Sequence, residues 1–195
     1  GQLDGPAGLD VAPDGRLLVA DRGNGRVVVF GADGRPGGAI RLGGTTVPGE
    51  PLDVAVAGDE AWVATGEALA RFEMDGGRVT GRFDGTPAVA VAAAAGQGVW
   101  AAVATAGSGA LAGVRAYRDR QASGEPVATW SSPDLAVGLF DGLEALGFGA
   151  DGRAYLVDVP PRVQRLTAAG VANAQLSGYD VVDADADAAG NVYAA

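Results

Sequence analysis

The sequence predicts an all-β protein built from repeated four-stranded units, and three observations support this. First, 33 glycines and 10 prolines interrupt the chain at short intervals, and lysine is absent, which favours short strands and turns over helices. Second, apolar segments flank Asp-Gly and similar turns, as in β-hairpins. Third, one strand–turn–strand pattern occurs five times along the chain. Because 48% of the residues are apolar, the chain can bury a sizeable core.

The pattern is clearest in the first unit, where an apolar strand, an Asp-Gly turn and a second strand run from Gly8 to Asp21. Related strand pairs return at 52–64, 89–102, 146–158 and 182–195. A large residue in the second strand marks the period: Leu18, Trp62, Trp100, Tyr155 and Tyr193. The steps of 44, 38, 55 and 38 residues average about 44, as in propeller blades. The longest step predicts an extended loop at 118–124 or 131–142.

Each of the first four units continues with a second hairpin, which brings its strands to four. Apolar segments at 26–30, 68–72, 113–117 and 162–166 are followed by further strands at 39–42, 78–83, 126–130 and 171–176. A single sheet of this composition would leave an apolar face in water, whereas radially stacked sheets cover both faces. We therefore expect a β-propeller in which Trp62, Trp100 and Tyr155 fill the space between blades.

The expected blades span about residues 4–43, 44–84, 85–131 and 132–178, and residues 179–195 supply only the opening strands of a fifth. The chain begins at Gly1 and ends inside an apparent strand. We therefore expect a single incomplete propeller domain, an open arc cut from a longer protein. The last blade would then have an exposed edge, and such an edge favours self-association of the chain.

The first unit resembles the NHL repeat. That motif combines an entry segment, a glycine turn, an apolar strand ending in aspartate, a Gly-Asn loop and an arginine. Here these are Pro6-Ala7-Gly8-Leu9, Asp14-Gly15, Leu18-Val19-Ala20-Asp21, Gly23-Asn24 and Arg26. The fourth unit keeps the turn, the strand and the arginine but has Pro160-Pro161 in place of the loop, and the second and third units lack the Asp–Arg pair. The resemblance implies a propeller that usually closes with six blades.

Charge and composition exclude several functions. The net charge is −10, from 24 acidic residues against 14 arginines without a basic cluster, which argues against nucleic acid and anionic membranes as partners. Without cysteine or histidine, the chain alone cannot build a disulfide, a Ser-His-Asp triad or a His-ligated zinc site. The uncharged stretch 85–114 is mostly alanine and glycine, so we expect no membrane span. The use of arginine alone suggests a GC-rich bacterial gene, and we expect an extracytoplasmic (periplasmic or secreted) protein.

Two Asp–Arg pairs occupy one repeat position: Asp21 with Arg26, and Asp158 with Arg162. An active-site role is one interpretation. Their recurrence favours a structural role, in which the carboxylate and the guanidinium tie the second strand of a blade to the third.

Three carboxylates, Asp10, Asp53 and Asp185, occupy equivalent places in the first strands of their units. First strands surround the axis of a propeller, so these groups could converge near the channel and hold Ca²⁺ or a polar ligand. Alternatively, each carboxylate accepts backbone hydrogen bonds. No other cofactor is expected.

Two further motifs fit their families poorly. The segment 183–187 resembles the start of a calcium loop, but Ala188 stands where the loop needs glycine and Ala194 where it needs glutamate. The segment 107–112 fits a loose dinucleotide fingerprint, yet the repeat places it between two strands instead of before a helix. Ser108 has no histidine partner and is no candidate nucleophile.

No residue constellation identifies a reaction, and we assign no catalytic residue. We expect a non-enzymatic recognition or scaffold propeller whose loops bind a protein, a peptide or a glycan. The alternative resembles the gluconolactonase and regucalcin propellers, which implies a calcium-dependent hydrolase or lyase with a Glu–Asn–Asp metal site in the central channel. The three asparagines, Asn24, Asn173 and Asn191, lie off the expected first strands, which weakens this alternative. A peptide-amidating lyase, another NHL propeller, is excluded because its zinc site needs histidine.

Overall fold

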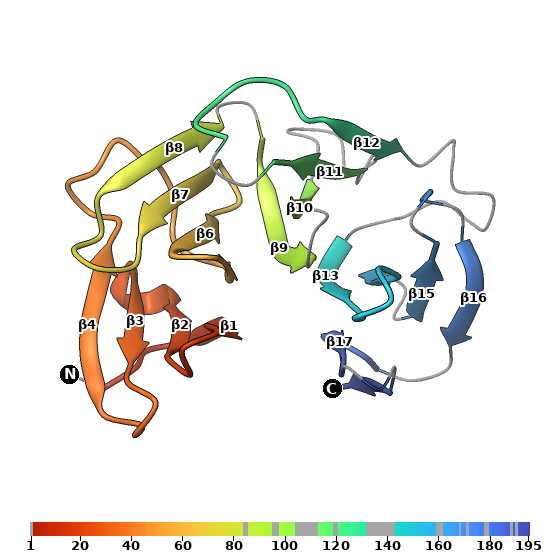
Figure 1. Ribbon diagram of the computed structural model, residues 1–195, viewed down its shortest axis with the longest axis horizontal. Helices are drawn as coiled ribbons and strands as arrows, with labels where there is room; N and C mark the ends of the chain where they lie inside the picture. Colours follow the sequence, from red (N-terminus) through yellow and green to blue (C-terminus); the bar gives the residue numbers. More distant parts are fainter. Residues whose placement is uncertain are drawn as a thin grey trace. The chain divides into compact units, whose positions relative to one another are not determined.

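The computed structural model of the chain describes residues 2–83, 86–94, 98–103, 113–118, 121–131, 143–158, 162–167, 169–170, 172–177, 180–187, 189 and 191–195. Within these ranges every element is a β-strand, apart from one turn of 3₁₀-helix, η1 (Arg22–Asn24). The strands form four four-stranded sheets and one two-stranded sheet (Figure 1). The prediction of four blades and the opening strands of a fifth is confirmed.

Strands in each sheet pair in chain order, so that consecutive antiparallel hairpins build a blade. The first sheet contains β1 (Pro6–Val11), β2 (Leu17–Asp21), β3 (Arg26–Phe30) and β4 (Pro36–Arg41). The second contains β5 (Asp53–Ala57), β6 (Glu60–Ala64), β7 (Leu69–Glu73) and β8 (Val79–Phe83). The third contains β9 (Ala88–Ala94), β10 (Gly98–Val103), β11 (Gly113–Tyr117) and β12 (Ala128–Ser131). The fourth contains β13 (Leu143–Phe148), β14 (Ala154–Asp158), β15 (Arg162–Leu166) and β16 (Ala172–Ser177), and β17 (Ala184–Ala186) pairs with β18 (Val192–Ala194).

The chain divides into two compact units. Residues Gly1–Ala88 with Asp119–Glu125 form the first unit, and Val89–Arg118 with Pro126–Ala195 form the second. In the first unit, alternate residues of the first and second sheets pack into one apolar core, as the two-residue period of a strand requires. This core includes Leu18, Val27, Ile40, Val54, Val63 and Phe72.

The first strands of the first two blades touch directly. A Cβ atom on Gly8 of β1 would lie 2.0 Å from the Oδ1 atom of Asp53 on β5, so only glycine fits there. Two residues further along β1, the Oδ2 atom of Asp10 accepts a hydrogen bond of 2.7 Å from the backbone amide of Val56. Close backbone approach and a side-chain bond thus join β1 to β5.

The outer strand of the second sheet is covered by part of the long loop that precedes β12. The backbone amide of Arg82 on β8 donates to the carbonyl of Ala122 at 2.9 Å. A Cβ atom on Gly81 would lie 2.9 Å from the same carbonyl oxygen. Unpaired edge strands pair readily with other chains, and this loop occupies part of that edge.

Three of the large aromatic residues by which the repeat was recognised are part of the buried cores. In the second unit, the indoles of Trp100 and Trp130 lie 4.2 Å apart and pack with residues of the fourth sheet. Tyr155 packs against Val181 and Ala184 at the last sheet. Trp62, in the first unit, is fully buried and stacks on Phe83 at 5.3 Å.

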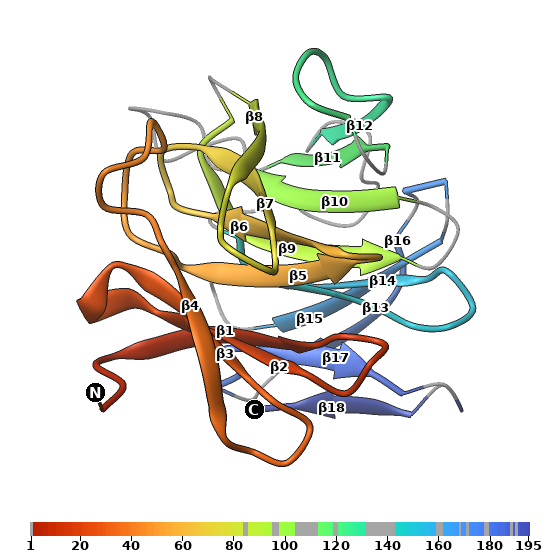
Figure 2. The same cartoon turned by 60° about the vertical axis from the view of Figure 1, so that its left-hand side comes forward.

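The last sheet is a single hairpin within the described residues (Figure 2). Asp185 of β17 faces Tyr193 of β18, and the hairpin is extended by hydrogen bonds between Ala195 and the backbone of Val182 and Asp183. Val182 and Tyr193 are both more than half exposed, at 66% and 62%. In the described ranges, no helix is long and apolar enough to cross a membrane.

Candidate functional site

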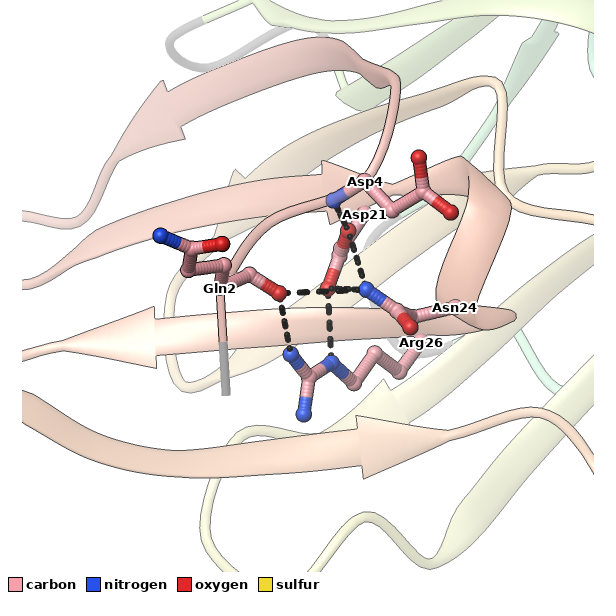
Figure 3. A network of polar contacts seen from close by, with 5 residues as sticks. All are labelled: Gln2, Asp4, Asp21, Asn24 and Arg26. Carbon is pink, nitrogen blue, oxygen red and sulfur yellow. Dashed lines mark hydrogen bonds and ion pairs between the residues drawn. The ribbon is translucent and has the colours of Figure 1, made fainter.

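An extensive cluster of polar contacts centres on Asp21, the last residue of β2 (Figure 3). Strand register places Asp21 opposite Arg26, the first residue of β3. The Nε atom of Arg26 donates to Oδ2 of Asp21 at 2.7 Å, and Nδ2 of Asn24 donates to both carboxylate oxygens at 3.1 and 3.0 Å. The backbone amide of Asp4 donates to Oδ1 at 2.7 Å. The Asp21 side chain is fully buried.

This cluster also holds the segment 2–4 through its backbone atoms. The carbonyl of Gln2 accepts from Nδ2 of Asn24 at 3.2 Å and from Nη2 of Arg26 at 3.4 Å (Figure 3). The amide of Gly23 donates to the carbonyl of Asp4 at 2.8 Å. We call Gln2, Asp4, Asp21, Asn24 and Arg26 the Asp21 cluster. It joins β2, η1 and β3 to the segment that leads into β1.

The pKa of Asp21 lies below the ordinary value for an aspartate. Burial alone would raise this pKa, but the hydrogen bonds from the Asp4 amide, Arg26 and Asn24 favour the charged form and outweigh burial. The carboxyl group is therefore ionised at neutral pH and acts as an acceptor for three donors.

The second Asp–Arg pair has the same register in the fourth sheet, where Asp158 faces Arg162. Arg162 donates through Nε at 2.8 Å and Nη2 at 2.7 Å to the two oxygens of a fully buried carboxylate. Nε2 of the buried Gln164 adds a contact of 3.3 Å. Both pairs proposed from the sequence are thus in contact. The Pro160-Pro161 segment lies outside the described residues.

The three first-strand carboxylates, Asp10, Asp53 and Asp185, share one local geometry. In each, Oδ1 accepts a hydrogen bond of 2.7–2.8 Å from the backbone amide of the next residue. Asp10 and Asp53 belong to the first unit and Asp185 to the second. No group of three acidic side chains suited to a metal ion occurs in the part of the chain that the structure describes. The calcium site considered from the sequence for Asp10, Asp53 and Asp185 therefore stays a prediction.

Two other motifs have limited structural counterparts. The dinucleotide-like segment 107–112, with Ser108, lies outside the described residues. In the calcium-loop-like segment, Asp187 accepts from the amides of Ala189 and Asn191 and from Nδ2 of Asn191, which organises the turn before β18. These bonds lower the pKa of Asp187, the side-chain bond from Asn191 most of all.

Sequence reasoning did not identify a salt bridge that joins two hairpin turns. Arg16 follows the Asp14-Gly15 turn, and its Nε donates to Asp14 at 2.7 Å while its Nη1 reaches Asp75, in the turn between β7 and β8, at 2.6 Å. The Arg16 amide also donates to Asp14, and this bond is the main cause of the lowered pKa of Asp14. The Asp-Gly-Arg triplet was the available signal, since Asp33-Gly34-Arg35 and Asp151-Gly152-Arg153 make the same backbone bond.

A buried ion pair inside the second sheet was also not predicted. Nη1 of Arg71 lies 3.1 Å from Oε2 of Glu60, and both side chains are nearly inaccessible to solvent. Arg71 also donates to Thr80 through Nε and Nη2, and its guanidinium lies 5.8 Å from the centre of the Trp62 ring. The charge is thus held by neighbours within one blade.

Comparison with known proteins adds evidence for the fold. The NHL repeat family model matches residues 3–30, which contain most of the Asp21 cluster. No curated protein sequence matches the chain. Among solved structures, regucalcin from Agrobacterium tumefaciens strain C58, described as a calcium-binding protein, aligns with a TM-score of 0.67 and 14% identity. That alignment covers 97% of this chain and 66% of regucalcin.

Virginiamycin B lyase from Staphylococcus aureus gives a TM-score of 0.68 at 13% identity, covering 100% of this chain and 64% of the lyase. A catalytically inactive histidine-to-alanine form of that lyase with quinupristin gives 0.62 at 14%, with 86% and 54% covered. Likenesses at such identities show the fold alone. The chain thus has the β-propeller fold and contains one matched NHL repeat at residues 3–30. It spans just under two thirds of the length of the first two structures.

Proposed function

We propose that this protein is a non-enzymatic recognition or scaffold propeller, which binds a protein, a peptide or a glycan through its loops. The proposal rests on what the recurrent carboxylates already contact. Asp21 and Asp158 are fully buried against Arg26 and Arg162. Each carboxylate oxygen of Asp10 accepts a hydrogen bond from a backbone amide. These side chains serve the architecture of the blades, which leaves exposed loop residues to meet a partner.

In the first unit, the hairpin turns offer such residues. Asp33 and Arg35, in the turn between β3 and β4, form a loose pair of 3.7 Å with side chains that are 59% and 87% exposed. Because exposed pairs contribute little to stability, both residues can change partners at little cost. The Arg16–Asp75 bridge links two neighbouring hairpin turns of the first and second sheets.

Arrays of peptides and glycans probed with the 195-residue chain test this proposal, with affinities measured by calorimetry for each ligand bound. We expect at least one ligand whose affinity falls about tenfold or more, or about 1.4 kcal/mol, when one exposed pair is removed. The variant Asp33→Ala/Arg35→Ala alters the β3–β4 turn. The matched control, Arg22→Ala/Glu50→Ala, removes an exposed pair of 3.2 Å at the opposite end of the strands. Binding that survives both changes would contradict recognition through these loops of the first unit.

The second candidate is a calcium-dependent hydrolase of the regucalcin type, and the placement of Asp10 and Asp53 on neighbouring first strands favours it. Calorimetry with Ca²⁺, followed by assays of lactone hydrolysis, tests this candidate. A micromolar site that is lost in Asp10→Asn and Asp53→Asn, together with hydrolysis, would replace the recognition proposal. A lyase dependent on histidine would need that residue from outside these 195 residues, which contain none.

A further inference from the structure

Asn24 combines a reactive sequence with a central structural position. Of the three asparagines in the chain, Asn24 is the one followed by glycine, whereas Asn173 precedes alanine and Asn191 precedes valine. Glycine has no side chain to hinder its backbone nitrogen, so an Asn-Gly pair can cyclise more readily than an asparagine followed by a larger residue. Asn24 is also exposed to water, which the later hydrolysis step requires.

The folded structure restrains both reacting groups. The nucleophile would be the backbone nitrogen of Gly25, whose N–H donates to the carbonyl of Arg22 at 3.0 Å. Gly25 is held in the left-handed region at φ 59°. The leaving nitrogen would be Nδ2 of Asn24, which donates to Oδ1 and Oδ2 of Asp21 and to the carbonyl of Gln2. Cyclisation therefore requires that the Asp21 cluster opens first.

We propose that Asn24 is a deamidation site, and that its reaction irreversibly removes the contact of Asn24 with the Gln2 carbonyl and so loosens the segment 2–4. The Gly25 nitrogen attacks Cγ of Asn24 and loses its proton, the new C–N bond closes a succinimide, and the Nδ2 group leaves as ammonia. Water then opens the ring to give aspartate or isoaspartate. No oxidant, reductant or cofactor takes part. The inference is independent of the proposed recognition function.

The product cannot restore the original contacts. The amide group of Asn24 donates to Asp21 and to Gln2, whereas a carboxylate only accepts. Its negative charge would also lie about as close to the buried Asp21 carboxylate as Nδ2 does now, and like charges at such a distance repel. The contact between Asn24 and the Gln2 carbonyl is lost, and the remaining ties of the segment are those made by Arg26, Asp21 and Gly23.

Deamidation kinetics test the first half of the proposal. The 195-residue chain is incubated at mildly alkaline pH, and peptide mapping by mass spectrometry follows each asparagine. A synthetic peptide with the sequence of residues 20–28 serves as the unrestrained reference. We expect conversion at Asn24 before Asn173 or Asn191, at a rate at least about fivefold below that of the peptide, the factor that one ordinary hydrogen bond supplies. A rate equal to that of the peptide, or unmodified Asn24 when Asn173 or Asn191 has reacted, would overturn it.

Hydrogen exchange tests the loosening of the segment 2–4. The Asp4 and Gly23 amides, which the cluster protects, should exchange faster in Asn24→Asp than in Asn24→Ala, since the alanine variant removes the donor without adding charge. Partly deamidated wild-type protein allows the same comparison in one sample, which is useful should Asn24→Asp fold poorly. Equal protection of these amides in modified and unmodified molecules would show that deamidation does not loosen the segment.

Discussion

A Cβ atom placed on Gly170 would lie 2.5 Å from Cδ1 of Trp130, well inside van der Waals contact. Gly170 follows β15 in the fourth sheet, whereas Trp130 lies on β12 of the third. The φ angle of Gly170 is +78°, a conformation that other residues adopt at a cost. A turn of the fourth blade therefore packs against an indole of the third, and glycine is required there both for its backbone and for its lack of a side chain.

We expect Gly170→Ala to lower the free energy of unfolding by about 3 kcal/mol, of which roughly 1–2 come from the left-handed backbone and the rest from overpacking. Gly34→Ala is the matched control, because Gly34 has a φ of +76° and no atom within 4 Å of its added Cβ. That variant should lose the backbone part alone. Urea unfolding followed by tryptophan fluorescence measures both, and equal losses would mean that the indole moves aside without cost.

Much of the architecture could be predicted from local sequence. Asp-Gly turns define hairpins, and one large residue per unit, such as Tyr155 on β14, sets the register of the repeat because successive hairpins reuse one pattern. The Asp21–Arg26 and Asp158–Arg162 contacts could be anticipated for the same reason. A residue pair that recurs at one position of the repeat is expected to have the same structural role in each blade.

Contacts made by backbone atoms, or between segments that are distant in the sequence, could not be predicted from local sequence patterns. The segment 2–4 is held through the Gln2 carbonyl and the backbone of Asp4, groups that nearly every residue offers, so no side-chain pattern marks it. Gly170 meets Trp130 across two sheets, and Glu60 meets Arg71 across two strands, where nothing in the repeat specifies a partner. Local patterns predicted the blades, and tertiary packing determined these contacts.

The buried Glu60–Arg71 pair leads to a prediction about coupling. Removing one member of a buried ion pair leaves an uncompensated charge and typically costs about 3–5 kcal/mol, whereas apolar replacement of both members is often neutral. Arg71→Met should therefore destabilise the protein by about 3 kcal/mol, and Arg71→Met/Glu60→Met by clearly less. A double-mutant cycle from urea unfolding measures the coupling. Additive losses would indicate that Arg71 acts mainly through Thr80 and Trp62.

Asp21 should contribute to acid sensitivity. Its folded-state pKa is lowered, by hydrogen bonds that outweigh burial, so the unfolded chain binds the proton more readily. The stabilisation is complete above the unfolded pKa, about 3.9 for aspartate, and is lost as pH falls through the lower folded pKa. Thermal unfolding between pH 7 and pH 2 should show a steeper decline for the wild type than for Asp21→Asn. Arg35→Ala, which alters an exposed pair, should keep the wild-type slope. Parallel curves for all three proteins would contradict this role.

The last prediction concerns β18, which pairs with β17 alone in the described part of the chain. Its residues Val192 and Tyr193 are exposed, so an unpaired edge and apolar side chains coincide. Such edges pair with other chains, and charged residues on them prevent it. The 195-residue chain should therefore associate with increasing concentration in sedimentation experiments, and Val192→Lys should shift it towards monomer. Val127→Lys, at an apolar residue with 49% exposure that lies outside the strands, controls for added charge. A wild-type chain that stays monomeric at every concentration, or an equal effect of both lysines, would show that β18 is not the contact.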